Sequence, residues 1–259
     1  MAEGIPKLDL PAAITALLFD LDGVLTKTAA VHDKAWKQTF DAFLEKRAAA
    51  EGEDFKPFDA DSDYNEYVDG KPRYDGVRSF LESRGIELPE GDADDPPSAQ
   101  TVCGLGNRKN ELVLELIAKD GVEPYAGSVA FVKAARAAGL RRAVVSASAN
   151  CKDVLEAAGI ADLFEERIDG IVTDERHLKG KPAPDTYLAG AAALGVEPAA
   201  ACVFEDAVSG VEAGHAGKFG HVVGVDRVNH AAALREHGAD VVVDDLGELI
   251  LDPGTGDAA

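Results

Sequence analysis

The chain has 259 residues, enough to bury a full core as one large domain or as a core with an insert. Its 26 basic and 47 acidic residues give a formal net charge of −21 at pH 7, so we expect neither nucleic acid nor a membrane as a partner. Three widely spaced cysteines without a Cys-x-x-Cys pair argue against a disulfide framework or a zinc site and favour a cytoplasmic compartment. The apolar stretch before Asp20 is short, which fits neither a signal peptide nor a membrane span.

That apolar run, residues 14–19, predicts a buried strand followed directly by Asp20 and Asp22. Side chains alternate along a strand, so both carboxylates can point to the same side, and Gly23 permits a sharp turn. One carboxylate could serve as nucleophile and metal ligand, and the other as acid and base. Taken alone, the same pattern fits an ordinary polar turn equally well.

Residues 29–117 have a mostly helical texture. Helices are predicted over residues 29–44, 64–68, 74–84 and 111–119, with exposed loops at 51–63 and 87–98. Because this stretch interrupts the strand pattern, we expect it to form an inserted helical cap domain.

From Tyr125 onward, short β-branched runs alternate with Ala-rich stretches. Strands are predicted at 142–146, 168–172, 201–204, 221–225 and 240–243, and helices at 129–139, 150–159, 183–195, 208–217 and 231–237. The alternation predicts an α/β core with a doubly wound, mostly parallel, Rossmann-like sheet that includes the strand at 14–19. We therefore expect a core domain of residues 1–28 and 118–259 and a cap domain of residues 29–117.

Further polar residues stand where a parallel sheet would gather them at one edge. Ser146 ends a strand, Lys181 precedes a helix, and Glu205 and Asp206 end another strand. Each has a structural alternative: Ser146 as a helix cap, Lys181 as a solvated lysine, and the acidic pair at the favourable end of a helix dipole. Together with Asp20 they supply what phosphoryl transfer requires, namely a nucleophile, metal carboxylates, a hydroxyl donor and a cation.

The segments that contain these residues resemble, in order, the four motifs of the haloacid dehalogenase-like superfamily. They are residues 19–25, 145–148, 180–185 and 205–214. The resemblance implies that Asp20 accepts the phosphoryl group and that Asp22 is the general acid and base. It implies that Ser146 and Lys181 hold the phosphoryl oxygens. Mg²⁺ would bind Asp20, the main-chain carbonyl of Asp22 and Asp206, with Glu205 in or next to that ligand set.

Residues 20–36 are also similar to the opening of the β-phosphoglucomutase subfamily. The similarity implies that His32 helps to hold Asp22 and that Trp36 lies near the sugar. His32 and Trp36 are four residues apart, so both could instead pack in the core of the cap. Lys27 departs from the subfamily, which often has an acidic residue at that position.

Other subfamily matches concern a second phosphate on the substrate. The stretch from Gly70 to Arg73 implies a contact of Arg73 with the distal phosphate, although Arg73 could also be a surface cation. Lys109 and Asn110 would reach the sugar, and Lys109 has the same surface alternative.

The loop after Ser146 would also hold the distal phosphate, through Ser148 and Asn150. Ala149 stands where a lysine is common in the subfamily, which weakens the case for a bisphosphate.

The expected function is therefore that of a magnesium-dependent isomerase, a phosphoprotein of carbohydrate metabolism that converts β-D-glucose 1-phosphate to glucose 6-phosphate. A small sugar phosphate is the expected partner, and we expect a monomer. A sugar-phosphate phosphatase with the same core is the alternative. A phosphoacceptor signalling module also clusters aspartates with a serine and a lysine, but it would leave the large cap unexplained.

Overall fold

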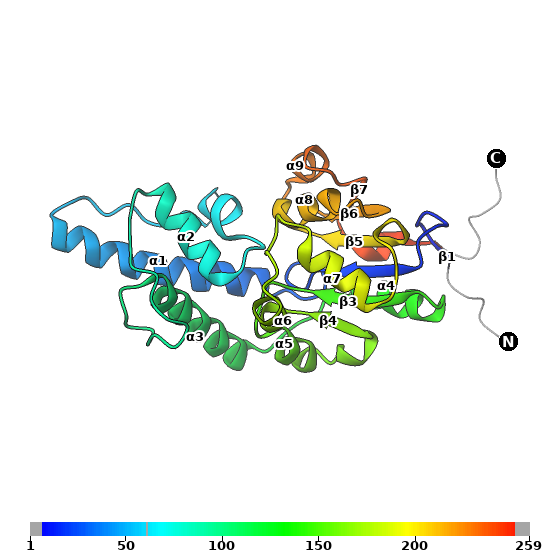
Figure 1. The fold of residues 1–259 in the computed structure, drawn as a ribbon, viewed down its shortest axis with the longest axis horizontal. Helices are drawn as coiled ribbons and strands as arrows, with labels where there is room; N and C mark the ends of the chain where they lie inside the picture. Colours follow the sequence, from blue (N-terminus) through cyan, green and yellow to red (C-terminus); the bar gives the residue numbers. More distant parts are fainter. Residues whose placement is uncertain (1–6, 61, 252–259) are drawn as a thin grey trace. The chain divides into compact units, whose positions relative to one another are not determined.

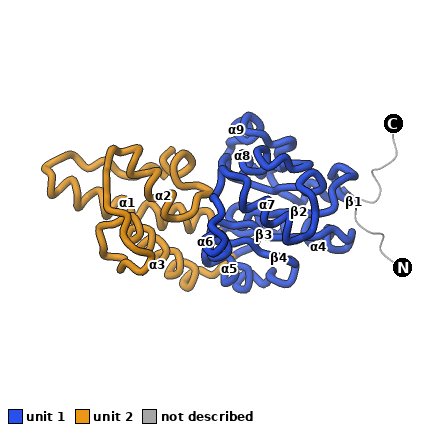
Figure 2. Tube along the Cα trace, viewed as in Figure 1, with its two compact units in different colours: residues 1–27, 123–259 blue, residues 28–122 orange. Residues whose placement is uncertain are grey.

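The computed structural model describes residues 7–60 and 62–251. It divides into two compact units, which we call the core unit, residues 1–27 and 123–259, and the helical unit, residues 28–122 (Figure 2). The boundary expected at residue 118 falls inside helix α3 (Val102–Asp120), and the division lies after Val122. None of the helices in the described ranges has the length and apolar composition needed to cross a membrane.

The core unit contains the predicted doubly wound parallel sheet, with the strand order β4-β3-β2-β5-β6-β7 (Figure 1). The strands are β2 (Ala16–Phe19), β3 (Arg141–Val145), β4 (Glu166–Ile168), β5 (Ala201–Glu205), β6 (His221–Val225) and β7 (Val241–Val243). In the parallel register, Phe19 lies opposite Val144 on one side and Phe204 on the other. The residues that follow these three positions therefore emerge at the same edge of the sheet.

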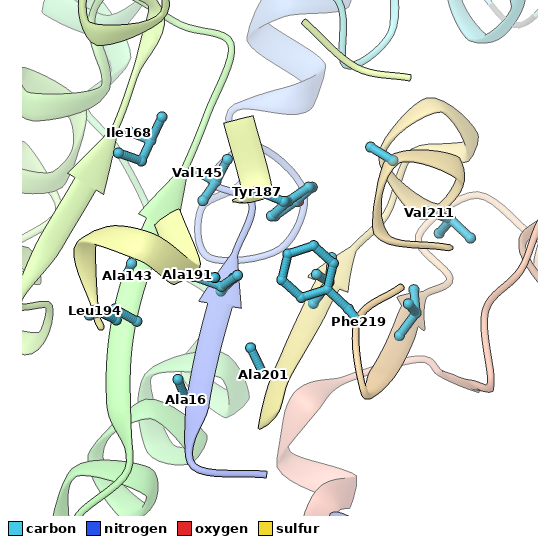
Figure 3. Packing of buried hydrophobic residues seen from close by; sticks show 14 of the residues in the cluster. Ala16, Ala143, Val145, Ile168, Tyr187, Ala191, Leu194, Ala201, Val211 and Phe219 are labelled. Atoms are coloured by element: carbon cyan, nitrogen blue, oxygen red, sulfur yellow. The ribbon is translucent and has the colours of Figure 1, made fainter. Parts of the chain in front are cut away.

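The helices of this unit cover both faces of the sheet. They are α4 (Ala126–Ala137), α5 (Cys151–Ala157), α6 (Gly170–Glu175), α7 (Asp185–Ala193), α8 (Val208–Ala216) and α9 (Ala231–Glu236), with 3₁₀ turns at η2 (Ala161–Leu163), η3 (Pro198–Ala200) and η4 (Leu246–Leu249). On one face Val145 of β3, Tyr187 of α7 and Val211 of α8 belong to one buried hydrophobic cluster (Figure 3). On the other face Phe19 stacks on Phe204 and meets the edge of Phe131 from α4. A short antiparallel pair, β1 (Lys7–Leu8) and β8 (Ile250–Leu251), forms a separate sheet.

The strand predicted at residues 168–172 is wrong. Strand β4 ends at Ile168, and helix α6 begins two residues later. The Asp169 side chain accepts a hydrogen bond from the Val172 amide and so caps this helix. The β-branched residues of this run predicted one strand, but the capping aspartate separates a strand before it from a helix after it.

The helical unit contains α1 (Ala29–Glu51), a π-helical turn η1 (Tyr64–Val68), α2 (Arg73–Ser83) and α3. Helix α3 begins nine residues earlier than the predicted start at 111, because the Thr101 side chain accepts a hydrogen bond from the Gly104 amide and caps it there. Lys109 therefore lies within helix α3 and not before it, as the predicted start at 111 implied.

Part of the acidic loop after α1 is anchored in the core of the helical unit. Phe58 is 1% exposed and packs against Phe40 and Phe80, with ring centroids 5.3 and 5.1 Å apart. The Phe58 amide donates to Asp41, and its carbonyl accepts from Lys37. Phe58 thus ties the exposed residues 51–57 to the helices.

Replacing Phe58 with alanine should destabilise the helical unit, because it removes a buried ring and leaves a cavity. We expect Phe58→Ala to lower the free energy of unfolding by about 3–5 kcal/mol in urea denaturation. Phe55, three residues earlier and 40% exposed, offers a matched control. Phe55→Ala should change the free energy by less than about 0.5 kcal/mol, and equal effects of the two variants would contradict the anchoring role.

Candidate active site

The site begins at the ends of the two central strands. Asp20 follows β2, and its amide donates to the Phe204 carbonyl of β5 at 3.0 Å. Glu205 is the last residue of β5, so the parallel register brings it beside Asp20. Both side chains are buried. Two carboxylates in such surroundings require a compensating cation.

Lys181 supplies that cation from the turn before α7. Its Nζ atom bonds to Asp20 Oδ1 and lies 2.5 Å from Glu205 Oε1, and the residue is only 4% exposed. Burial lowers the pKa of Lys181, but the two carboxylates outweigh that effect and raise the pKa above its ordinary value. Burial raises the pKa of Asp20 well above its usual range, and Lys181 acts against that rise. A charged lysine is therefore fixed against the carboxylate predicted to be the nucleophile.

Glu205 is held by groups that the sequence analysis did not identify. The hydroxyl of Tyr187 donates to Glu205 Oε1 at 2.8 Å, and the Ala207 amide donates to Oε2 at 3.1 Å. Burial, followed by the charge of Glu205, raises the pKa of Tyr187, so this hydroxyl keeps its proton. A Cβ atom at Gly210 would lie 1.8 Å from Glu205 Oε1. Tyr187 follows Lys181 by six residues in the sequence. Only the structure of the turn and helix α7 shows that both side chains reach Glu205.

Asp206 completes a group of carboxylates that could hold a cation. Oxygen atoms of Asp20, Glu205 and Asp206 lie within 4.8 Å of one another. Gly23, at φ +84°, packs so closely on Asp206 that a Cβ atom there would lie 1.6 Å from Oδ2. Lys181 bonds to Asp20 and Glu205, and Asp206 adds a third carboxylate next to them. All-oxygen donors of this kind suit a hard divalent cation such as Mg²⁺.

Ser146 begins a loop whose backbone is held by side-chain hydroxyls. The Ser148 amide donates to Ser146 Oγ at 3.1 Å, and the Asn150 amide donates to Ser148 Oγ at 3.2 Å. Gly170 of α6 donates its amide to the Ser148 carbonyl, and a Cβ atom on this glycine would lie 2.8 Å from the Ala149 nitrogen. Because Ser146 Oγ accepts from a backbone amide, its own proton can be donated elsewhere.

Asp22 lies in a compact turn that follows Asp20. The Gly23 amide donates to the Thr26 carbonyl at 2.8 Å, and Thr26 Oγ1 donates to the Leu21 carbonyl at 3.2 Å. The Asp22 side chain is half-buried. These hydrogen bonds hold the backbone on both sides of Asp22.

A second group of predicted residues lies in the helical unit. Lys109 Nζ is 2.8 Å from His32 Nδ1 and 4.7 Å from the centroid of the Trp36 ring. An ammonium group has no lone pair, so His32 Nδ1 must accept, and its ring proton is on Nε2. Lys109 is buried, which excludes the surface alternative for this residue. Trp36 stacks on Phe40 at 5.1 Å and so belongs to the aromatic core of this unit as well.

Arg73 begins helix α2 and is oriented by an aromatic neighbour. Its Nη2 donates to the Tyr74 hydroxyl at 3.2 Å, and that hydroxyl donates to Asn107 Oδ1 at 2.9 Å. Gly70, at φ +69°, forms the turn that leads into the helix. Asn110 follows Lys109 in α3 and is half-buried. Among the predicted residues, the structure thus brings together Asp20, Lys181, Glu205 and Asp206 in the core unit. It brings together His32, Trp36 and Lys109 in the helical unit.

Comparison with known proteins identifies the family to which this chain belongs. The model of the haloacid dehalogenase-like hydrolase family matches residues 14–218. A β-phosphoglucomutase of Mycobacterium tuberculosis is 56% identical over 246 residues, which cover 94% of each chain. A β-phosphoglucomutase of Bacillus subtilis is 31% identical over 238 residues, or 92% of each chain. The crystal structure of β-phosphoglucomutase from Clostridium difficile has a TM-score of 0.70 at 26% identity and covers 91% of this chain and 93% of that one. The chain therefore belongs to the haloacid dehalogenase-like hydrolase family and, within it, to the phosphomutases of the β-phosphoglucomutase group.

Proposed function

We propose that this enzyme is a magnesium-dependent β-phosphoglucomutase that converts β-D-glucose 1-phosphate to glucose 6-phosphate through a phosphorylated Asp20. The observation that carries the proposal is the buried cluster in which Lys181 bridges Asp20 and Glu205 beside Asp206. Its relatives named β-phosphoglucomutase support the choice of substrate.

Each residue of the cluster has a role that its chemistry supports. Asp20 is the nucleophile, and the Lys181 ammonium and the Ser146 hydroxyl stabilise the oxygens of the phosphoryl group as charge develops. Asp22 takes the proton from the attacking sugar hydroxyl and returns a proton to the leaving oxygen. Phospho-Asp20 transfers its phosphoryl group to the C6 hydroxyl of glucose 1-phosphate. The resulting bisphosphate reorients in the site. It then returns the phosphoryl group on C1 to Asp20, which leaves glucose 6-phosphate.

Mg²⁺ would be held by Asp20, Asp206 and the main-chain carbonyl of Asp22, with Glu205 beside them. When bound, it would neutralise charge on the carboxylates and the phosphoryl oxygens. Glu205 already accepts hydrogen bonds on both oxygens, so its larger role is to orient Lys181.

The helical unit would act as a cap that selects the sugar and excludes water from phospho-Asp20. Trp36, Lys109 and Asn110 would meet the sugar, and His32 would help to hold Asp22. Gly70, Arg73, Ser148 and Asn150 would hold the distal phosphate. Thr26 and Lys27 are fixed by backbone bonds to Leu21 and Glu123 within the core unit. We infer that a hinge between the cap and the core unit would lie beyond Lys27.

The proposal and its alternative differ in what attacks phospho-Asp20. Ala149 stands where a lysine is common in the subfamily, in the loop that would hold the distal phosphate. The absence of this positive charge favours a phosphatase. We expect the wild-type enzyme, primed with glucose 1,6-bisphosphate, to form glucose 6-phosphate faster than it releases inorganic phosphate. Coupled assays of both products on several hexose phosphates measure the ratio. Faster phosphate release on every sugar would establish the phosphatase instead.

Removal of the proposed acid and base should stop turnover but leave the fold intact. We expect Asp22→Ala to lower kcat by about 10²–10⁴-fold, the usual worth of general acid–base catalysis. Circular dichroism serves as the check on folding. A folded Asp22→Ala variant with kcat close to that of the wild type would exclude this role.

The close packing of Gly23 on Asp206 predicts a selective loss of metal affinity. A side chain at this position must displace Asp206, so Gly23→Ala should weaken Mg²⁺ binding by about 10–100-fold in isothermal titration calorimetry. Gly159 is a matched control in the same unit, because its φ is +67° and a Cβ atom added there would meet no atom of the described residues within 4 Å beyond its chain neighbours. Gly159→Ala carries the same backbone strain and should bind Mg²⁺ like the wild type. Equal affinities of the two variants would count against the proposed metal site.

A further inference from the structure

Arg227, in the loop between β6 and α9, makes a set of contacts that the proposed chemistry does not use. Its Nε donates to the Gly23 carbonyl at 2.8 Å, and its Nη1 donates to the Asp244 carbonyl at 2.7 Å. The same Nη1 lies 3.6 Å from Asp245 Oδ2. The face of the guanidinium group stacks on the ring of Tyr125, with Cζ 3.6 Å from the centroid. The side chain is only 15% exposed.

These contacts join the two segments by which the chain leaves and re-enters the core unit. The segments pair through backbone hydrogen bonds, from the Lys27 amide to the Glu123 carbonyl and from the Tyr125 amide to the Leu25 carbonyl, both at 2.9 Å. Arg227 bonds to the first segment at Gly23 and stacks on the second at Tyr125. One side chain therefore holds both.

The bonded carbonyl belongs to the turn that carries Asp22. Gly23 follows Asp22 directly, and its Cα lies against the carboxylate of Asp206. The turn is thus held by Arg227 at its carbonyl and packed against Asp206 at its Cα. A planar guanidinium group can donate along two directions and stack at the same time, whereas a lysine ammonium cannot.

We propose that Arg227 is a positioning residue that fixes the Asp22–Gly23 turn relative to Asp20 and Asp206. Its contacts with the turn run through the backbone of Gly23 and not through the reacting groups. The inference rests on the proposed function, because Asp22 is there the acid and base that must face the reacting oxygens. Displacement of such a group by about 1 Å can cost 10²-fold in rate.

The central test replaces Arg227 with glutamine. We expect Arg227→Gln to lower kcat for conversion of β-glucose 1-phosphate by about 10²-fold, while KM stays within a few-fold of the wild type, since residues of the helical unit would recognise the sugar. Hydrogen–deuterium exchange of the substrate-free protein should become faster in peptides that cover residues 20–27. Arg227→Lys, which keeps the charge but not the fork, should fall between the wild type and Arg227→Gln in both measurements.

Arg235 provides the control, because it is an exposed arginine on the adjacent helix α9. Arg235→Gln should leave kcat and the exchange of residues 20–27 unchanged. A wild-type kcat in Arg227→Gln would overturn the proposal. So would exchange that rises equally in β6 and α9, because that pattern indicates only general loosening.

The two proposals fail in different ways. If the wild-type enzyme forms no glucose 6-phosphate, the proposed function is wrong, and the exchange of residues 20–27 in the Arg227 variants still shows whether Arg227 fixes the turn. If the wild type is active and Arg227→Lys matches it in both kcat and exchange, the function stands and the positioning role of the guanidinium group is wrong.

Discussion

The ammonium group of Lys181 between Asp20 and Glu205 is the interaction on which the rest of the site depends. A carboxylate buried at the end of a central strand is costly unless its charge is compensated in place. Lys181 reaches Asp20 across 161 residues of sequence, and Glu205 holds the same ammonium from the neighbouring strand. Tyr187 in turn holds Glu205. In the proposed reaction, charges that are already held in place would need little reorganisation when a phosphoryl group arrives, and such positioning is the main source of catalysis in phosphoryl transfer.

Glycines at three positions of the site are as important as its charged residues. Gly23 and Gly210 each lie where a Cβ atom would collide with a carboxylate, of Asp206 and Glu205 respectively. A Cβ atom at Gly170 would also collide, at 2.8 Å from the Ala149 nitrogen in the loop after Ser146. Asp206 and Glu205 keep their positions because Gly23 and Gly210 have no Cβ atom on the side that faces each carboxylate.

In the helical unit, polar side chains lie against an aromatic core and not at the ends of strands. Trp36 stacks on Phe40 and also lies beneath the Lys109 ammonium. The same side chain therefore packs in the core and orients a cation. His32 accepts from the same lysine, which sets its tautomer. Residues that would meet a sugar are thereby held in place by the core of the unit that carries them.

The sequence by itself determined the parallel sheet, the order of its strands along the chain, and the residues at the strand ends, because alternating apolar runs and short polar motifs are local patterns. It also indicated the helical insert, although it began α3 too late and extended β4 into a helix, since single capping residues such as Thr101 and Asp169 decide where helices begin. Only the tertiary structure decided which side chains meet. Tyr187 beneath Glu205, Lys109 between His32 and Trp36, and Arg227 against Gly23 are contacts between distant segments. No local pattern encodes such contacts, because they depend on how the strands and helices pack.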